Sequence, residues 1–272
     1  MLKRLNLIRP EDNDIKYKII NFPDGESHLI FTEELNRKDS ILIICRICNP
    51  NDLFILMQIG DILNRQGITF YINITYLMSM RMDRVITFEE SYSLKIVADM
   101  INNIKPKSVN IIEPHSNKCI DLINNSDISC VSSKYLHNDD HGLIFPDEGA
   151  KQRYSYNIYS YRKDIITCNK VRDVNTGKII KFELDNHDAI NTKDCFYVID
   201  DLCDGGGTFA AVAKEVRKLN KDVKLCIYIT HMVNPKGIKT LSNNYNEVYF
   251  TNSYRDWQKE KLPDNVKVIQ VV

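Results

Sequence analysis

The chain has 272 residues, and its 36 Lys and Arg are balanced by 36 Asp and Glu, so the formal net charge is zero. At 43% hydrophobic and 26% charged residues, this composition excludes a disordered chain, which would need fewer apolar residues and a larger net charge. Zero net charge also argues against a nucleic-acid-binding protein with a broad basic surface. A few well-placed cations would still suffice to bind small phosphorylated molecules.

The cysteines and the apolar runs indicate where the protein acts. Eight cysteines are spread along the chain, several inside apolar runs such as 41-ILIICRIC, and such usage is typical of buried free thiols in a reducing compartment. Cys45 and Cys48 have the spacing of half a zinc site, but no second pair follows at a matching distance. The sequence has neither an apolar stretch of signal-peptide length at its start nor an apolar run of roughly 18 residues. We therefore expect a cytoplasmic protein with no membrane partner.

Short β-rich runs alternate with segments of helical period, which is typical of a parallel α/β architecture. Apolar residues recur every three or four positions at 53–63, 94–101 and 209–219, and these segments are predicted helices. Strands are predicted at 41–45, 69–77, 107–113, 164–169, 179–184, 195–200, 224–230 and 247–251. The irregular stretch 132-SSKYLHNDDHG separates two sets of these elements. We expect two domains, 1–138 and 139–272, each a mainly parallel sheet flanked by helices.

The segment 195-CFYVIDDLCDGGGTFAAVAKEVRKL carries the most chemical information. An apolar strand runs into Asp200 and Asp201, and carboxylates at that end of a strand can bind the two vicinal hydroxyls of a ribose or a hydrated magnesium ion. A third acid and a glycine turn then lead into an amphipathic helix, in the order Asp204, Gly205, Gly206, Gly207 and Thr208. Glycines let the backbone N–H groups face one point, and the helix adds its positive N-terminal end. The segment therefore predicts a cradle for a phosphate monoester.

This segment resembles the phosphoribosyl-diphosphate-binding signature that type I phosphoribosyltransferases share with ribose-phosphate diphosphokinases (phosphoribosyl-diphosphate synthetases). Several further stretches resemble the diphosphokinases, and they occur in the order of that family over nearly the whole chain. The resemblance implies that both domains are phosphoribosyltransferase-like. Taken alone, each stretch has a simpler reading, but their joint ordered occurrence favours the family.

Three stretches resemble elements that bind ATP in the diphosphokinases. The stretch 22-FPDGE resembles the loop that contacts the adenine, and 76-YLMSMRMDRVITFEESYSLKIVADMI resembles the segment with the ATP-binding Arg-Gln-Asp. The stretch 113-EPHS resembles the Asp-Leu-His motif, which places His115 on the ATP-bound metal. The matching ATP-binding residues are Phe22, Asp24, Glu26, Arg81 and Asp83. Met82 stands where the family usually has glutamine.

Three more stretches resemble elements that act on the sugar phosphate. The stretch 146-PDEGAKQR resembles the Ser-Pro-Asp-x-Gly-x-x-Lys-Arg segment and implies that Asp147 lies at the ribose and the metal. The stretch 168-CNKVRD resembles a mobile loop with the catalytic pair Lys-x-Arg, which gives Lys170 and Arg172, and 230-THMVNPKG resembles a Thr-His-Gly element. With His115 these two cations form the implied catalytic set. The implied magnesium ligands are His115, Asp147 and Asp200.

The resemblance implies that ATP transfers diphosphate to the 1-hydroxyl of ribose 5-phosphate, with Mg²⁺ as cofactor and AMP as the leaving product. Such an activity belongs to nucleotide biosynthesis. In the family the loop that corresponds to Phe22 completes a neighbouring subunit's ATP site, so a homodimer or a larger homo-oligomer is implied.

The chain departs from the family in two ways that bear on its substrate. It is shorter than usual members, and Gly205 replaces the threonine usual in the phosphate loop, which removes one hydroxyl donor and its bulk. A roomier loop would accept a ribose whose 5-phosphate is already esterified, as in ADP-ribose. Shortened members are encoded by bacteriophages beside nicotinamide phosphoribosyltransferase-like proteins. ADP-ribose is therefore an alternative acceptor, with a role in NAD resynthesis in the host cytoplasm.

Two readings from other classes remain. A phosphoribosyltransferase would cleave phosphoribosyl diphosphate with a base and would need no ATP. An inactive regulatory homologue would be expected to lack the cations of the mobile loop or the acids, whereas Lys170, Arg172, Asp200 and Asp201 are all present.

Overall fold

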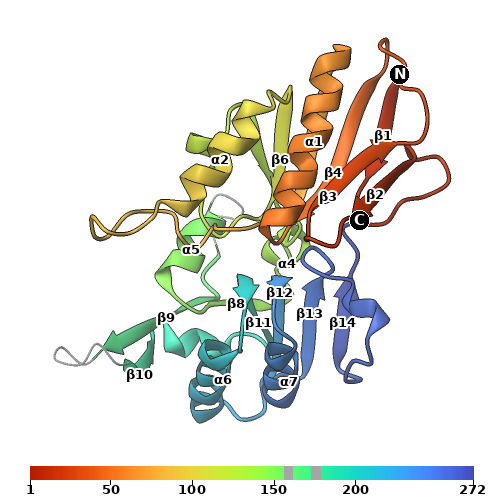
Figure 1. The fold of residues 1–272 in the computed structure, drawn as a ribbon. Helices are drawn as coiled ribbons and strands as arrows, with labels where there is room; N and C mark the ends of the chain where they lie inside the picture. The colour runs from red at the N-terminus through yellow and green to blue at the C-terminus, as the bar shows by residue number, and fades with distance from the viewer. Residues whose placement is uncertain (156–161, 173–178) are drawn as a thin grey trace. The chain divides into compact units, whose positions relative to one another are not determined.

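The computed structural model describes residues 1–155, 162–172 and 179–272, and for 170–172 and 179–182 it describes the backbone alone. Contacts divide the chain into two compact units, Met1–Ser129 together with Val272, and Cys130–Val271 (Figure 1). Each unit is built on a mainly parallel sheet flanked by helices, which confirms the predicted α/β class.

The first unit contains a sheet of five parallel strands in the order β1-β4-β5-β6-β7. These strands are β1 (Leu2–Asn6), β4 (Ser40–Ile47), β5 (Phe70–Leu77), β6 (Ser108–Ile112) and β7 (Ser126–Ser129). A separate antiparallel hairpin joins β2 (Tyr17–Asn21) and β3 (Ser27–Phe31). The helices of this unit are α1 (Pro50–Gln66), α2 (Ser93–Asn103) and α3 (Lys118–Leu122).

Helix α1 shows why these sequences fold as they do. Asn49 and Asp52 form a reciprocal capping box at its start, and Gly67 ends it in the left-handed conformation at φ 70°. Its predicted apolar positions, among them Leu56 and Leu63, are buried in one core with the strands of the sheet. Capping and periodicity therefore agree, and the predicted helix is confirmed.

The second unit contains a sheet of seven strands in the order β10-β9-β8-β11-β12-β13-β14, in which only the edge strand β10 is antiparallel to its neighbour among the described pairs. These strands are β8 (Gly142–Phe145), β9 (Ile165–Arg172), β10 (Ile179–Leu184), β11 (Cys195–Cys203), β12 (Lys224–Met232), β13 (Glu247–Thr251) and β14 (Val266–Ile269). The helices are α4 (Ser133–Leu136), α5 (Glu148–Tyr154), α6 (Gly207–Leu219), α7 (Pro235–Asn244) and the 3-10 turns η2 (His187–Asn191) and η3 (Trp257–Lys259). Helices α6 and α7 lie side by side (Figure 1).

The second unit begins at Cys130, earlier than the boundary that the sequence predicts between residues 138 and 139. Tyr135 and Leu136 are buried with Phe145 and Tyr228 in one cluster of the second unit. Because these apolar side chains belong to that core, the irregular stretch folds with the second unit and is not a linker between the two.

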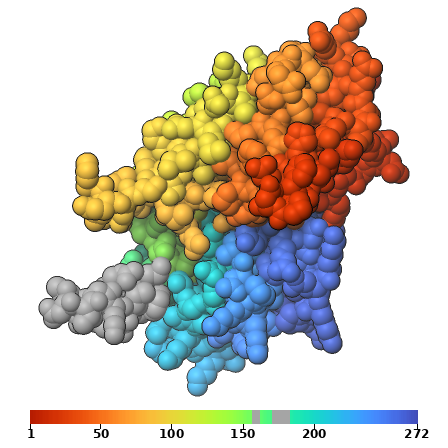
Figure 2. Space-filling view, in the orientation of Figure 1, coloured from red at the N-terminus to blue at the C-terminus, as the bar shows by residue number. Residues whose placement is uncertain are grey.

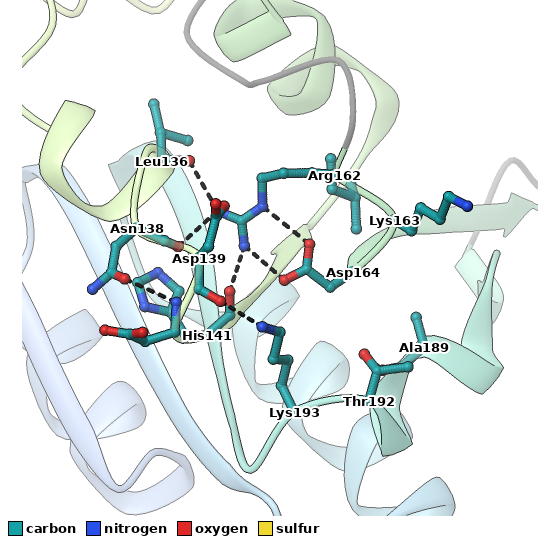
Figure 3. A network of polar contacts seen from close by, with 12 residues as sticks. Leu136, Asn138, Asp139, His141, Arg162, Lys163, Asp164, Ala189, Thr192 and Lys193 are labelled. Carbon is teal, nitrogen blue, oxygen red and sulfur yellow. Dashed lines mark hydrogen bonds and ion pairs between the residues drawn. The ribbon is translucent and has the colours of Figure 1, made fainter.

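A buried arginine fixes the irregular stretch, as Figure 3 shows. The Arg162 side chain is 1% exposed and forms a two-point ion pair with Asp164, at 2.9 and 3.0 Å. Its guanidinium also donates to the backbone carbonyls of Leu136, Asn138 and His141. These bonds satisfy carbonyls that no strand or helix partner would satisfy, so residues 136–141 hold a defined path before β8.

The eight cysteines are all free, and Cys45 is buried in β4. Burial raises the pKa of Cys48 to about 12, which disfavours the thiolate that zinc requires. Within the described ranges, no helix is long and apolar enough to cross a membrane.

Candidate active site

The stretch 22-FPDGE forms the turn between β2 and β3 in the first unit. The N–H of Phe22 donates to the carbonyl of Glu26 at 2.8 Å, and Gly25 adopts a φ of 93° that favours glycine. The carboxylate of Asp24 accepts from the N–H of Glu26 at 3.1 Å, which tightens the turn. All three predicted adenine-site residues are exposed, and 46% of Phe22 is accessible. A turn that presents an aromatic ring and two acids to solvent is suited to contact a ligand or a second subunit.

A groove of about 1280 Å³ lies between this hairpin and α1. Phe22 and Glu26 line one end of it, and Phe31, Phe54 and Met57 give it an apolar floor. In the part of the chain that the structure describes, its lining does not include Arg81, Asp83 or His115. The hairpin end of the predicted ATP site is therefore separate, within this unit, from the residues that follow β5 and β6.

The loops that follow β5 and β6 meet through Asp83 and Ser116, the residue after the predicted His115. These strands are parallel neighbours, so both loops leave the same edge of the sheet. The Ser116 hydroxyl donates to Asp83 Oδ2 at 2.7 Å, and Lys118 Nζ donates to the Asp83 carbonyl at 3.2 Å. The backbone N–H of His115 contacts the Met80 sulfur at 3.3 Å. Two stretches more than thirty residues apart therefore form one polar cluster.

This cluster keeps Asp83 ionised and exposes its neighbours. Partial burial opposes ionisation, but the bonds from Ser116 and Arg84 outweigh it and lower the pKa of Asp83. Arg81 is exposed, as is Met82 at 45%. The following loop projects from the first unit, in the yellow-orange part of Figure 2, and carries the fully exposed Phe88. The cluster thus has a fixed anion beside accessible cationic and apolar groups.

The predicted phosphate loop joins β11 to α6 in the second unit. Gly206 caps α6 at a φ of 80°, and a Cβ there would lie 2.9 Å from the Cβ of Thr240. At Gly237, near the start of α7, a Cβ would lie 2.1 Å from the Asp204 carbonyl oxygen. These two glycines allow the loop and α7 to pack backbone against backbone, with the α6 N-terminus directed at the turn.

Helix α7 also holds the loop through two side chains that the sequence analysis did not identify. Asn234 Nδ2 donates to Asp204 Oδ1 at 2.8 Å, and Thr240 Oγ1 donates to the carbonyl of Gly205 at 3.0 Å. A Cβ added at Gly205 would have no heavy atom within 4 Å. The loop is therefore braced on its α7 side and open beside Gly205.

The acidic pair at the end of β11 faces an arginine from α5. Arg153 Nη1 lies 3.0 Å from Asp200 Oδ1 and 2.7 Å from Asp201 Oδ1. The Asp201 side chain is 1% exposed and that of Asp200 is 16% exposed. Burial and the nearby Asp201 raise the pKa of Asp200 well above its usual range, and Arg153 opposes them. The pair is thus a partly compensated concentration of negative charge.

Asp147 and His231 occupy structural positions near this sheet. Asp147 is the N-cap of α5 and accepts from the Ala150 N–H at 2.9 Å, so one of its oxygens serves the helix. His231, in the stretch 230-THMVNPKG, is fully buried, and its Nδ1 lies 2.8 Å from the Ser253 hydroxyl. Burial places His231 in a polar core cluster, where it supports the end of β12.

Lys170 and Arg172 lie at the end of β9, whose backbone pairs with β10 through Lys170 and Phe182. Their side chains lie outside the described residues, so their roles stay predictions. The strand they occupy adjoins β8, the strand that leads into Asp147 and α5.

No family model matches the sequence, but curated proteins are similar to it over most of its length. The chain is 24% identical over 268 residues to the ribose-phosphate pyrophosphokinase of Mycoplasmopsis pulmonis, covering 92% of this chain and 80% of that protein. It is 22% identical over 237 residues to the enzyme of the same name from Mycoplasma pneumoniae, covering 83% and 71%. The chain is a homologue of the ribose-phosphate pyrophosphokinases.

A solved crystal structure has a similar fold. Phosphoribosylpyrophosphate synthetase from Mycobacterium smegmatis matches 99% of this chain and 94% of its own, with a TM-score of 0.78 at 16% identity. This likeness confirms the predicted α/β fold.

Proposed function

We propose that the protein is a diphosphotransferase that moves the β,γ-diphosphate of ATP to the 1-hydroxyl of a ribose phosphate. The observation that carries this proposal is the glycine turn Gly205–Gly207, which lies between two carboxylates and a helix N-terminus. A turn of this kind can bind a phosphate monoester and the hydroxyls of its sugar together. The relatives are named ribose-phosphate pyrophosphokinases, which supports diphosphate transfer to a ribose phosphate, and ATP is the donor that we propose.

In the proposed reaction the ribose 1-oxygen attacks the β-phosphorus in line. The bond from that phosphorus to the oxygen shared with the α-phosphate breaks, AMP leaves, and the hydroxyl proton is lost. Such transfers depend mainly on positioning and on neutralising the charge of the transferring group. Asp200 and Asp201 would orient the sugar, the N–H groups and Thr208 would hold its 5-phosphate, and Lys170 and Arg172 would neutralise charge.

Magnesium, when bound, would supply positive charge that offsets the negative charge of the phosphates. Asp200 and Asp147 offer the hard oxygen donors that Mg²⁺ prefers, and His115 is the third ligand that the resemblance implies. No group of three or more His, Cys, Asp and Glu suited to a metal occurs in residues 1–155, 162–172 and 179–272.

The ATP side of the proposed site comprises Arg81, Asp83 and His115, with Phe22, Asp24 and Glu26 at the hairpin. Because the hairpin residues are exposed, their proposed role is to complete the ATP site of a second copy. This part of the proposal predicts a homodimer or a larger homo-oligomer that acts in the cytoplasm.

One observation favours ADP-ribose as a second candidate acceptor. A Cβ added at Gly205 would have no heavy atom within 4 Å apart from its chain neighbours, which leaves space beside the loop where an esterified 5-phosphate could extend. Transfer of diphosphate to ADP-ribose would give a donor for nicotinamide addition and a role in NAD resynthesis, as expected of a bacteriophage enzyme.

The test incubates the protein with Mg-ATP and either ribose 5-phosphate or ADP-ribose, and follows AMP release and product mass. Gly205→Thr should lower turnover of ADP-ribose more than that of ribose 5-phosphate, and Gly205→Ala serves as the matched control. Turnover of ribose 5-phosphate alone would overturn the ADP-ribose reading. Turnover of neither acceptor, with cleavage of phosphoribosyl diphosphate by a base, would favour a phosphoribosyltransferase. No reaction in any assay would favour an inactive homologue.

A further inference from the structure

The acid pair at the end of β11 has an unusual arrangement for consecutive residues of a strand. Side chains of neighbouring strand residues point to opposite faces, which would separate Asp200 from Asp201. Here both carboxylates reach the same nitrogen, Arg153 Nη1, at 3.0 and 2.7 Å. One cation therefore draws together two anions that would otherwise repel each other.

Two bonds fix the orientation of the Asp200 carboxylate. Its Oδ1 accepts from Arg153 Nη1 at 3.0 Å and from the backbone N–H of Asp201 at 2.9 Å. With 16% of the side chain exposed, Asp200 can accept a hydrogen bond from a ligand hydroxyl while Arg153 holds the carboxylate in place.

Helix α5 holds Arg153 rigidly enough for this role. Asp147 caps the start of the helix, and at its end Tyr154 is 2% exposed and stacks on Phe145 of β8 at 6.1 Å. Strand β8 is the direct parallel neighbour of β11, the strand that carries the acid pair. The backbone of Arg153 is therefore anchored to the sheet beside its two partners.

We propose that Arg153 is a positioning residue for the sugar acceptor, which it serves by holding the Asp200 and Asp201 carboxylates side by side. This role rests on the proposed function of the acid pair as the ribose-binding group. In this role Arg153 acts through the two carboxylates and not by contact with ATP or with the reacting atoms. Its loss should therefore weaken acceptor binding selectively, and the ATP side should be unchanged.

The test compares Arg153→Met, which keeps the length but removes the charge, with Arg153→Lys, which keeps one donor and the charge. Lys151→Met is the matched control, because Lys151 lies on the same helix and pairs only loosely, at 3.9 Å, with Glu148. Michaelis constants for ribose 5-phosphate and ATP are measured separately, with melting temperatures to establish folding. Binding of ribose 5-phosphate is also measured by calorimetry, which needs no turnover.

Because a charge-assisted bond is lost, the Michaelis constant for ribose 5-phosphate should rise about tenfold or more in Arg153→Met. The rise should be smaller in Arg153→Lys. The Michaelis constant for ATP should stay within about twofold of wild type in both variants. In a third variant, Arg153→Ala, added methylguanidine should partly restore acceptor binding because it replaces the missing guanidinium. If Arg153→Met does not fold, the proposal is tested by the binding of ribose 5-phosphate to Arg153→Lys, measured by calorimetry. Folded variants with unchanged acceptor binding, or with equal losses for ATP and acceptor, would overturn the proposal. A wild type without turnover would overturn the proposed function instead, and the binding comparison would still test Arg153.

Discussion

Asn234 donates a hydrogen bond from Nδ2 to Oδ1 of Asp204, at 2.8 Å, and so joins helix α7 to the first residue of the phosphate loop. The same side chain caps α7, because its Oδ1 accepts from the N–H of Lys236 at 2.9 Å. One amide thus performs two tasks, and the two can be separated by mutation.

Asn234→Ser should keep the helix cap and lose the bond to Asp204. We expect the free energy of unfolding to stay within about 0.5 kcal/mol of wild type, because serine caps helices about as well as asparagine. Acceptor affinity should fall several-fold, since Asp204 is no longer held. Asn234→Ala, which loses both bonds, is the comparison, and denaturant titration with acceptor binding gives both readouts. Equal acceptor affinity in wild type and Asn234→Ser would show that the brace is not needed.

Two glycines of the loop, Gly205 and Gly206, should differ sharply in their tolerance of a methyl group. Gly206→Ala combines a left-handed φ of 80° with a Cβ only 2.9 Å from Thr240, so it should lower stability by about 1–2 kcal/mol and weaken phosphate binding. Gly205→Ala, which meets open space, should be within about 0.5 kcal/mol of wild type. Chemical denaturation of both variants makes the comparison, and similar losses would contradict this geometry.

Asp200→Asn should abolish turnover without lowering stability at neutral pH. Because burial and Asp201 raise the pKa of Asp200 in the folded protein, its ionisation opposes folding. The protonated carboxyl of Asp200 stabilises the folded protein below the ordinary pKa of an aspartate, and this stabilisation is lost as the pH rises through the raised pKa of the folded state. The asparagine variant cannot ionise and does not lose it. The melting temperature of the variant should therefore rise relative to that of wild type as the pH increases between these two pKa values. A neutral-pH melting temperature clearly below wild type would show that the carboxylate stabilises the fold.

Mutation of the Arg162 network, shown in Figure 3, should lower the stability of the protein, in contrast to Asp200→Asn, which should affect turnover. Arg162→Met leaves Asp164 and three backbone carbonyls without their donor, so unfolding free energy should fall by about 3–5 kcal/mol. Lys218→Met, which removes an exposed pair with Glu215, should change it by less than about 1 kcal/mol. Urea titrations of both variants test this, and losses of equal size would argue against a structural role for the network.

Much of the fold could be predicted because its strongest elements are long and periodic. Helices α1 and α6 carry apolar stripes at helical spacing, and the central strands are continuous apolar runs. Strand β8 was not predicted because its four residues are too few for any period to be visible. Helix α7 was not predicted because its sequence, PKGIKTLSNN, is mostly polar and its apolar contacts are few. Such elements depend on tertiary packing.

The candidate site could be predicted only where its residues are contiguous. Asp200 to Thr208 form one segment whose chemistry is readable from its order. Arg153 and Asn234 reach this segment from elements 47 and 30 residues away from their partners. Each lies in a stretch that resembles the family, Arg153 at the end of 146-PDEGAKQR and Asn234 within 230-THMVNPKG, but the sequence does not show which residue each one contacts.

We propose that the loop Asp204–Thr208 binds a ribose phosphate so that diphosphate can be transferred to it. The most direct measurement is the mass of the product formed from Mg-ATP and each acceptor, with AMP quantified in the same reaction and Asp201→Ala as the inactive control. We expect one AMP released for each acceptor that gains a diphosphate group, and no product from Asp201→Ala. AMP-free reactions with both acceptors, or undiminished product from Asp201→Ala, would contradict the proposed function.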